Sequence, residues 1–245
     1  MDKFRLGKTG LMVTRIGFGG IPIQRLTENE AVKVVQRCLD LGLNFIDTAN
    51  GYSVSEERIG KAVRGRRQDV IIATKTGART GEEIMKHLDL SLQRLQTDYI
   101  DLYQFHQVGS PEAMQQVLNP ENGLLSVFEE ARKAGKIRHI GVTSHQIDIA
   151  KQLVASDKFE TMMFPFNFIT SEPADELIPL CRNHDVGFID MKPIGGGMLM
   201  DAAIAFKWLF QFPDIAIIPG IETVSYTHLR AHETVLDLVC RLLLE

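Results

Sequence analysis

Residues 100–106 read IDLYQFH, an apolar run that has the length of a buried strand and ends on a histidine. Two earlier runs have the same form: residues 70–75 read VIIATK and end on a lysine, and residues 43–47 read LNFID and end on an aspartate. Parallel strands that are buried on both faces give such near-continuous apolar runs. In a barrel of parallel strands, reactive side chains lie at the carboxyl ends of the strands, around one pocket. The sequence therefore predicts that a carboxylate, an amine and an imidazole meet at one rim.

Strand-like and helix-like segments alternate along the chain. The strand-like runs end near eight positions, which are Phe18, Ile46, Thr74, Phe105, Val142, Phe164, Ile189 and Ile218. Segments with apolar residues at helical spacing lie between them, at residues 29–41, 82–95, 126–134, 175–183 and 203–210. This alternation is typical of an α/β fold of the (β/α)8 TIM barrel class, and a chain of 245 residues has the length of one such barrel.

Two short strand-like pieces precede the first strand of the predicted barrel. Residues 3–6 and 11–14 flank the turn-forming sequence GKTG, which predicts a β-hairpin that caps one end of the barrel. No linker or internal repeat interrupts the pattern. We therefore expect one barrel domain over residues 1–223.

The composition limits the function classes. A formal net charge of -4 gives no electrostatic case for binding nucleic acid or an anionic membrane. The one basic cluster, Arg64, Arg66 and Arg67, is expected to be the solvated end of a helix. The three cysteines Cys38, Cys181 and Cys240 have no paired spacing, which is typical of reduced thiols in the cytoplasm. With no signal peptide and no apolar stretch near ~20 residues, we expect a cytoplasmic protein without a membrane span.

Beyond the three strand ends, a tyrosine lies five residues after the aspartate, at Tyr52, and a Ser-Glu pair follows at residues 55–56. With Asp47, Lys75 and His106, this order of residues resembles the aldo-keto reductases, from the hairpin to about residue 223. The resemblance implies that Asp47, Tyr52, Lys75 and His106 are the catalytic residues. It also implies an oxidoreductase that reduces aldehydes or ketones to alcohols, with NADPH or NADH as the hydride donor.

The chemistry of carbonyl reduction explains these residue types. Hydride transfer to a carbonyl leaves negative charge on its oxygen, so the site needs a proton donor aimed at that atom. A free tyrosine, with a pKa of about 10, is a weak acid, and an ammonium a few Å away makes a phenol a better donor. We therefore expect Tyr52 to be the general acid, Lys75 to be paired with Asp47, and His106 to orient the carbonyl. Each residue alone also fits a structural role, but four such coincidences on one rim fit it poorly.

The cofactor is expected to lie on glycine-rich loops, because the chain has no GxGxxG after a strand. The sequence KPIGGG follows the seventh strand at residues 192–197 and IPG ends the eighth at residues 218–220, where barrels of this class usually bind phosphate. In the family, the carboxamide of the nicotinamide is usually held by Ser-Asn and often by Gln, where this chain has Ser144-His145 and Met163. The resemblance thus implies that the cofactor is bound by Gly19, Gly20, Asp47, Ser144, His145, Met163, Lys192, Pro193, Ile194, Gly195, Gly197, Pro219, Gly220 and Ile221.

The resemblance stops at about Val224. Residues 224–245 do not continue into the polar helix that holds the adenosine end in the family, and we interpret them as an atypical, artefactual tail in place of the last helix. The resemblance is strongest to a bacterial branch whose members often carry a C-terminal iron–sulfur extension. An iron–sulfur cluster is expected only in a longer parent protein, and no metal site is expected in this chain. Two further hypotheses stay open: an NADPH-binding regulatory subunit, and a truncated inactive fragment. The sequence does not indicate the oligomeric state.

Overall fold

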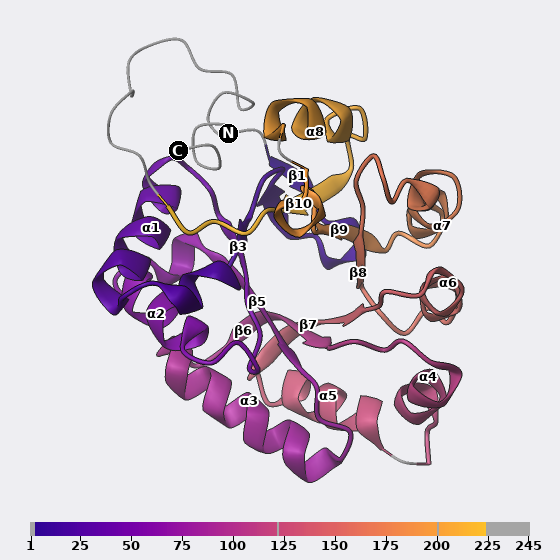
Figure 1. Ribbon diagram of the computed structural model, residues 1–245. Coiled ribbons are helices and arrows are strands. Elements are labelled where there is room, and N and C mark those ends of the chain that lie inside the picture. Colours follow the sequence, from indigo (N-terminus) through magenta and orange to yellow (C-terminus); the bar gives the residue numbers. More distant parts are fainter. Residues whose placement is uncertain (1–2, 122, 200, 224–245) are drawn as a thin grey trace.

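A computed structural model describes residues 3–121, 123–199 and 201–223 and forms a barrel of parallel strands surrounded by helices (Figure 1). Eight strands pair in the order β10-β9-β8-β7-β6-β5-β4-β3. Bridges between Ile16 and Ile217 and between Gly19 and Gly220 join the two edge strands and close the barrel. The strands are β3 (Phe18–Gly19), β4 (Phe45–Asp47), β5 (Ile71–Thr76), β6 (Ile100–Phe105), β7 (Ile137–Thr143), β8 (Thr161–Pro165), β9 (Gly187–Met191) and β10 (Ile215–Ile218).

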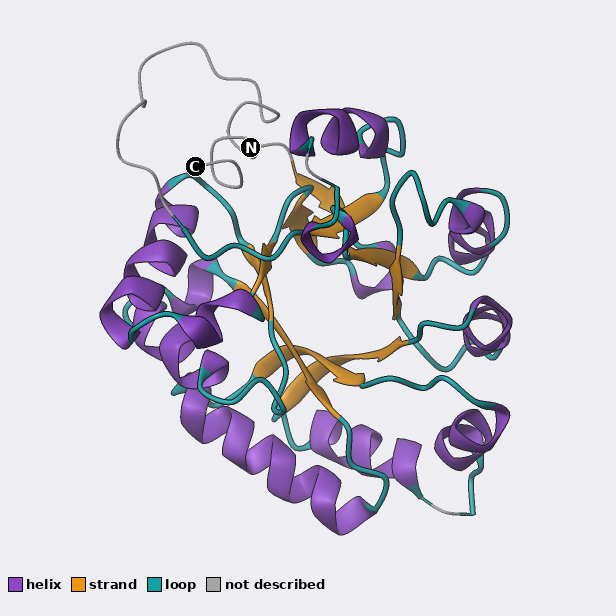
Figure 2. Cartoon of the chain, in the orientation of Figure 1, coloured by secondary structure: helices purple, strands orange, loops and turns teal. Residues whose placement is uncertain are grey.

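Helices lie around the outside of the barrel (Figure 2). They are α1 (Glu28–Asp40), α2 (Ser55–Ala62), α3 (Gly81–Leu95), α4 (Pro111–Leu118), α5 (Leu124–Lys133), α6 (Ile147–Ala155), α7 (Leu177–Asn183) and α8 (Ala202–Leu209). The (β/α)8 prediction is confirmed, and each predicted strand end lies within two residues of the observed one. The helical spacing did not indicate α2, α4 or α6. The expected replacement of the last helix by a tail falls on residues 224–245, outside the described residues.

The predicted hairpin is confirmed as β1 (Lys3–Arg5) paired with the antiparallel strand β2 (Met12–Thr14). It closes the amino end of the barrel. Leu6 is fully buried there, and a Cβ on Gly187, the first residue of β9, would come within 2.7 Å of the Leu6 Cγ. Leu6 and Val13 pack in one apolar cluster with the inward-facing residues Phe45, Ala73 and Leu102. The interior of the barrel is therefore filled by apolar side chains at this end.

The helices pack on the barrel through a second, larger apolar cluster. Helix α1 shows how the sequence sets one of these elements. Thr27 and Glu30 form a reciprocal capping box at its start, and Gly42 follows its end with a φ of 92°. Glycine adopts this left-handed conformation without steric cost, so the helix ends there. Among the described helices, none is long and apolar enough to cross a membrane.

The basic cluster after α2 is not simply a solvated helix end. Arg66 forms an ion pair with Asp40 at 2.5 Å. Arg67 is half-buried, and its guanidinium bonds Asp101 at the start of β6 at 2.7 Å. The expectation was wrong for Arg67, because its long side chain reaches from the loop before β5 to a buried carboxylate that helical spacing does not reveal.

Candidate active site

The carboxyl ends of three adjacent strands bring the predicted catalytic residues together. Asp47 is the last residue of β4, Lys75 is the fifth residue of β5, and His106 directly follows β6. Because side chains alternate along a strand, Asp47 shares the inward face with Phe45, and Lys75 shares it with Ala73. A carboxylate and an ammonium are thus held inside the barrel, just below its mouth.

Asp47 and Lys75 form a buried ion pair. The Lys75 Nζ lies 2.6 Å from the Asp47 Oδ1 and also donates to the Thr48 carbonyl at 2.6 Å. The other Asp47 oxygen accepts a longer bond, of 3.3 Å, from the Gln104 amide. Both side chains of the pair are almost inaccessible. Burial raises the pKa of Asp47 above its ordinary value, while the Lys75 ammonium acts in the opposite direction.

Tyr52 lies in the loop between β4 and α2, and this loop is fastened to the barrel. The Ser55 hydroxyl donates to the Gly20 carbonyl at 2.8 Å. The buried Glu56 carboxylate accepts from the Thr74 hydroxyl at 2.7 Å and lies 3.4 Å from an Arg94 nitrogen. The Ser-Glu pair that follows Tyr52 therefore holds the tyrosine-bearing loop against the ends of the strands.

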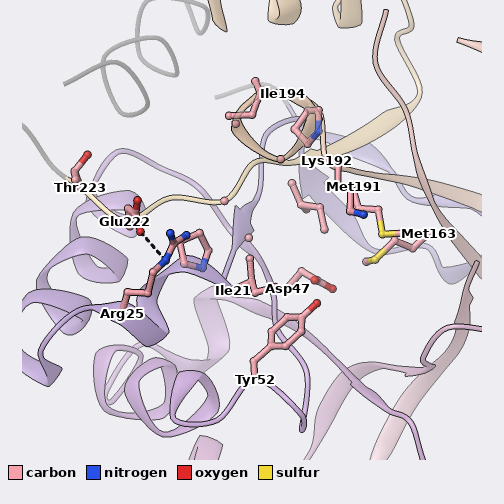
Figure 3. Close-up of a pocket in the computed structure, with 18 residues that line it drawn as sticks. Ile21, Arg25, Asp47, Tyr52, Met163, Met191, Lys192, Ile194, Glu222 and Thr223 are labelled. Carbon is pink, nitrogen blue, oxygen red and sulfur yellow. Dashed lines mark ion pairs between the residues drawn. The ribbon is translucent and has the colours of Figure 1, made fainter. Parts of the chain in front are cut away.

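The tyrosine lies over the ion pair. The Lys75 Nζ is 5.2 Å from the centre of the Tyr52 ring, and the His106 ring meets that ring edge-on with 5.9 Å between centroids. In Figure 3 the Tyr52 hydroxyl points toward Asp47. The structure thus brings Asp47, Tyr52, Lys75 and His106 into one group, with the tyrosine half-buried above the others.

His106 is held neutral by its surroundings. Burial is the largest cause, and the charges of Lys75, His145 and Arg79 add to it, so the pKa of His106 falls to about 3. A neutral imidazole carries one donor nitrogen and one acceptor nitrogen. At neutral pH His106 can therefore donate a hydrogen bond without acting as a cation.

A cavity of about 800 Å³ opens beside this group (Figure 3). Its size is within the range of small-molecule sites. The residues predicted for catalysis or cofactor binding that line it are Gly19, Gly20, Asp47, Tyr52, Met163, Lys192, Pro193, Ile194, Gly197 and Gly220. It is also lined by Ile21, Pro22 and Arg25, in the segment that follows Gly19 and Gly20, and by Met191, which sequence reasoning missed. Arg25 and Glu222 form an ion pair of 3.3 Å on its wall.

The glycines of the cavity wall have distinct roles. Gly19 is required by close approach, since a Cβ there would lie 2.6 Å from the Pro219 carbonyl oxygen. Gly196 and Gly197 have φ values of 71° and 97°, and a Cβ on either would meet nothing within 4 Å. The N–H groups of Gly195 and Gly197 donate to the Lys192 and Ile194 carbonyls, at 2.9 and 3.0 Å, whereas no backbone carbonyl of the described residues accepts from the Gly196 N–H, which can face an anion. An open cavity with this loop on one side is compatible with the phosphates of a dinucleotide.

Seven of the predicted residues do not line the cavity: Lys75, His106, Ser144, His145, Gly195, Pro219 and Ile221. The first two lie beneath and beside Tyr52, as described above. The buried Ser144 hydroxyl bonds both backbone groups of Gln146, at 3.2 and 3.3 Å, so it is occupied within its own loop. The expected carboxamide contacts of Ser144 and His145 stay a prediction. Within the described residues, no three side chains of the metal-binding types lie together.

Comparison with known proteins places the chain in a family. The sequence model of the aldo/keto reductase family matches residues 15–224, and the chain belongs to that family. It is 30% identical over 215 residues to the uncharacterized oxidoreductase YqkF of Bacillus subtilis, covering 82% of this chain and 67% of that protein. It is 32% identical over 205 residues to the aldo-keto reductase YhdN of the same organism, covering 76% of this chain and 60% of that protein.

Solved structures agree with this assignment. The holo form of the aldo-keto reductase AKR11C1 from Bacillus halodurans is 27% identical to this chain. The match has a TM-score of 0.77 and covers 89% of this chain and 85% of that one. The barrel and its order of strands are therefore those of the family.

Proposed function

We propose that the protein reduces aldehyde or ketone carbonyls to alcohols with a nicotinamide cofactor, and that Asp47, Tyr52, Lys75 and His106 are its catalytic residues. The observation that carries this proposal is the buried Asp47–Lys75 pair beneath the Tyr52 ring, at the edge of a cavity with a glycine-lined wall. Relatives of 28% identity include an "NADH-specific methylglyoxal reductase" of Escherichia coli and an "aldo-keto reductase yakc [NADP(+)]" of Schizosaccharomyces pombe. These names support a nicotinamide cofactor and leave both forms open.

The cofactor would be held by the glycine loops, with Gly196, Gly197 and Gly220 on the cavity wall. When bound, it supplies the hydride that reduces the carbonyl carbon. Tyr52 donates its phenolic proton to the carbonyl oxygen, which becomes the alcohol. The Lys75 ammonium, 5.2 Å from the tyrosine ring, stabilises the phenolate that this transfer leaves behind.

The remaining two residues prepare this step. Asp47 holds the ammonium in place at 2.6 Å and balances its charge, so that the ion can stay charged inside the barrel. The neutral His106 donates a hydrogen bond to the carbonyl oxygen and so directs it toward the Tyr52 hydroxyl.

The substrate is then a small molecule, and the proposal requires no nucleic acid. We also propose a cytoplasmic setting, which is supported by the buried free thiols of Cys38 and Cys181.

Cofactor binding is the first test. NADPH and NADH are each titrated into the purified chain while the fluorescence of its single tryptophan, Trp208, and of the reduced nicotinamide is followed. Saturable binding followed by oxidation of the cofactor on addition of an aldehyde would support the proposal. Binding without turnover across an aldehyde and ketone panel would instead support the regulatory-subunit hypothesis.

Replacing the tyrosine tests the mechanism directly. Tyr52→Phe keeps the ring beside His106 and removes only the proton donor. We expect kcat to fall roughly 100- to 10,000-fold, the usual contribution of a positioned general acid. The dissociation constant of NADPH should change little. A variant that retains more than a third of the wild-type kcat would exclude Tyr52 as the proton donor.

A further inference from the structure

Arg79 is a half-buried cation without an acidic partner. It lies in the loop between β5 and α3, next to the mouth of the barrel. Its guanidinium donates to three backbone carbonyls, those of Ala78 at 3.0 Å, His106 at 2.6 Å and Gln107 at 3.4 Å. Among the ion pairs of residues 3–121, 123–199 and 201–223, none includes Arg79. Since a guanidinium has five N–H donors, two of them have no acceptor in these bonds.

The positive charge of Arg79 is not balanced by an ion pair among the described residues. Of the basic groups near the His106 ring, burial lowers the pKa of His145, which disfavours its charged form. The Asp47 carboxylate at the mouth is already paired with Lys75. A half-buried charge without a counterion is unfavourable. The arrangement is therefore one that an anion from outside the chain would stabilise.

The cofactor phosphates do not explain this charge. In the closed order of eight strands, β5 and β9 are four strands apart, so the loops that follow them lie on opposite sides of the mouth. The glycine turn that suits phosphate follows β9, and Arg79 follows β5. Tyr52 and His106, where the carbonyl would react, follow β4 and β6, the strands on either side of β5, so Arg79 lies on the same side of the mouth as the reacting group. An anion at Arg79 would thus belong to the other reactant.

We propose that Arg79 binds a carboxylate on the substrate, and that the preferred substrates are aldehydes or ketones bearing a carboxylate. This inference rests on the proposed reduction and adds the substrate class. The donors left over are the Nε–H and one Nη1–H, each of which can donate to a carboxylate oxygen, and the charge of arginine persists on burial. The bonds to the His106 and Gln107 carbonyls fix the guanidinium next to the residue that orients the reacting oxygen.

A matched pair of substrates tests the inference. The compounds are 4-carboxybenzaldehyde and 4-formylbenzamide, which have nearly the same shape and differ by one negative charge. Turnover of both is measured in the wild-type chain, Arg79→Met, Arg79→Lys and the control Lys133→Gln. The control removes an exposed charge at the end of α5, which precedes β7 and so lies near the base of the barrel.

We expect the wild-type chain to prefer the carboxylate compound in kcat/KM by roughly 10- to 100-fold, the usual range for a hydrogen-bonded charge pair. Arg79→Met should lose this preference while its kcat/KM for the amide stays within about threefold. Arg79→Lys should keep part of the preference, and Lys133→Gln all of it. An equal loss for both compounds in Arg79→Met would overturn the inference, because it would mean that Arg79 only fastens its loop.

Binding separates a failure of the inference from a failure of the proposed function. Calorimetric titration of the two compounds into each variant, with and without NADP⁺, requires no turnover. A preference for the carboxylate that depends on Arg79, in a chain that reduces neither compound, would support the anion site and count against the reductase. Reduction of both compounds with equal affinity would do the reverse.

Discussion

Two buried aspartates of this barrel are paired with cations, and they differ in what else surrounds them. Asp47 ends β4 at the mouth of the barrel, and Asp101 is the second residue of β6, toward the base. Their exposed fractions are 3% and 2%. By residue type and burial alone, the two sites are equivalent.

Their hydrogen bonds are not equivalent. Asp101 accepts bonds from Arg67 at 2.7 Å, from Arg138 at 3.1 Å and from the backbone of Ile72 at 3.0 Å. Arg67 is fixed further by the carbonyls of Val70 and Tyr99 and by the Thr97 hydroxyl. Such a cluster ties together the loop before β5 and the starts of β5, β6 and β7. Arg67 and Arg138 also lie over the Tyr99 ring, at 4.1 and 3.8 Å from its centre. None of these residues lines the cavity beside Tyr52.

The pair at the mouth is less completely bonded. Asp47 has one short bond, to Lys75, and one long bond, to Gln104. The Gln104 carbonyl oxygen is itself buried without a partner among the described residues. Here the pair contacts an open cavity and lies beneath a tyrosine. A buried aspartate–cation pair is thus structural where its bonds join chain segments, and suited to catalysis where the aspartate and the neighbouring tyrosine line a cavity.

The largest effect should come from removing the cation at the mouth. In Lys75→Met the phenolate of Tyr52 loses its nearest positive charge, so we expect kcat to fall roughly 100- to 10,000-fold. The dissociation constant of NADPH should stay within about threefold, because Lys75 does not line the cavity. Single-turnover kinetics and cofactor titration measure the two quantities separately. A parallel loss of affinity and kcat would mean that the pair supports binding and has no distinct role in proton transfer.

Removing the cation at the base should affect stability instead. Arg67→Met leaves Asp101 with only the half-exposed Arg138, so we expect the free energy of unfolding to fall by about 3 kcal/mol, as for a broken buried pair. The kcat of the folded fraction should stay within about twofold, since Arg67 is remote from Tyr52. Urea unfolding and activity at low urea test both statements. Arg66→Met is the matched control, because its pair with Asp40 is exposed and should contribute less than about 1 kcal/mol.

The functional residues at the mouth of the barrel could be predicted from the sequence more fully than the ion pairs at its base. Asp47, Lys75 and His106 each end an apolar run, and the order of strands alone brings strand ends to one rim. Strand ends were therefore placed within two residues. Helices α2, α4 and α6 were not indicated by helical spacing. In α4 only Val117 is buried, and its cap, Ser110 before Pro111, is a local signal that periodicity ignores. In α6 the buried residues Ile149, Ala150, Leu153 and Val154 do have helical spacing, and the segment was overlooked.

What the sequence could not predict depends on side chains that reach across elements. Arg67 bonds Asp101, which lies 34 residues further along the chain, and Arg25 forms an ion pair with Glu222, which is far from it in the sequence. The Ser144 hydroxyl turns back to Gln146, which no residue pattern indicates. Arg79 belongs to the same class: its position after a strand was visible, but its lack of an acidic partner requires the coordinates. Pairings of this kind depend on packing in three dimensions and leave no period in the sequence.

The smallest expected effect is on the pKa of His106. It distinguishes the two aspartate–cation pairs, because Lys75 at the mouth acts on this pKa and Arg67 at the base does not. Burial and then the Lys75 charge lower its pKa to about 3, whereas an unfolded histidine has a pKa of about 6.5. Between these values the unfolded chain binds the extra proton, so this residue lowers stability as the pH falls from 6.5 and contributes no pH dependence above it.

NMR titration of the His106 ring should show no inflection between about pH 5 and 8 in the wild-type chain. Lys75→Met should raise this pKa, and Arg67→Met should leave it unchanged. A normal titration near 6.5 in the wild-type chain would mean that His106 is solvated and charged at mildly acidic pH, and the neutral hydrogen-bond donor required by the mechanism would be lost there.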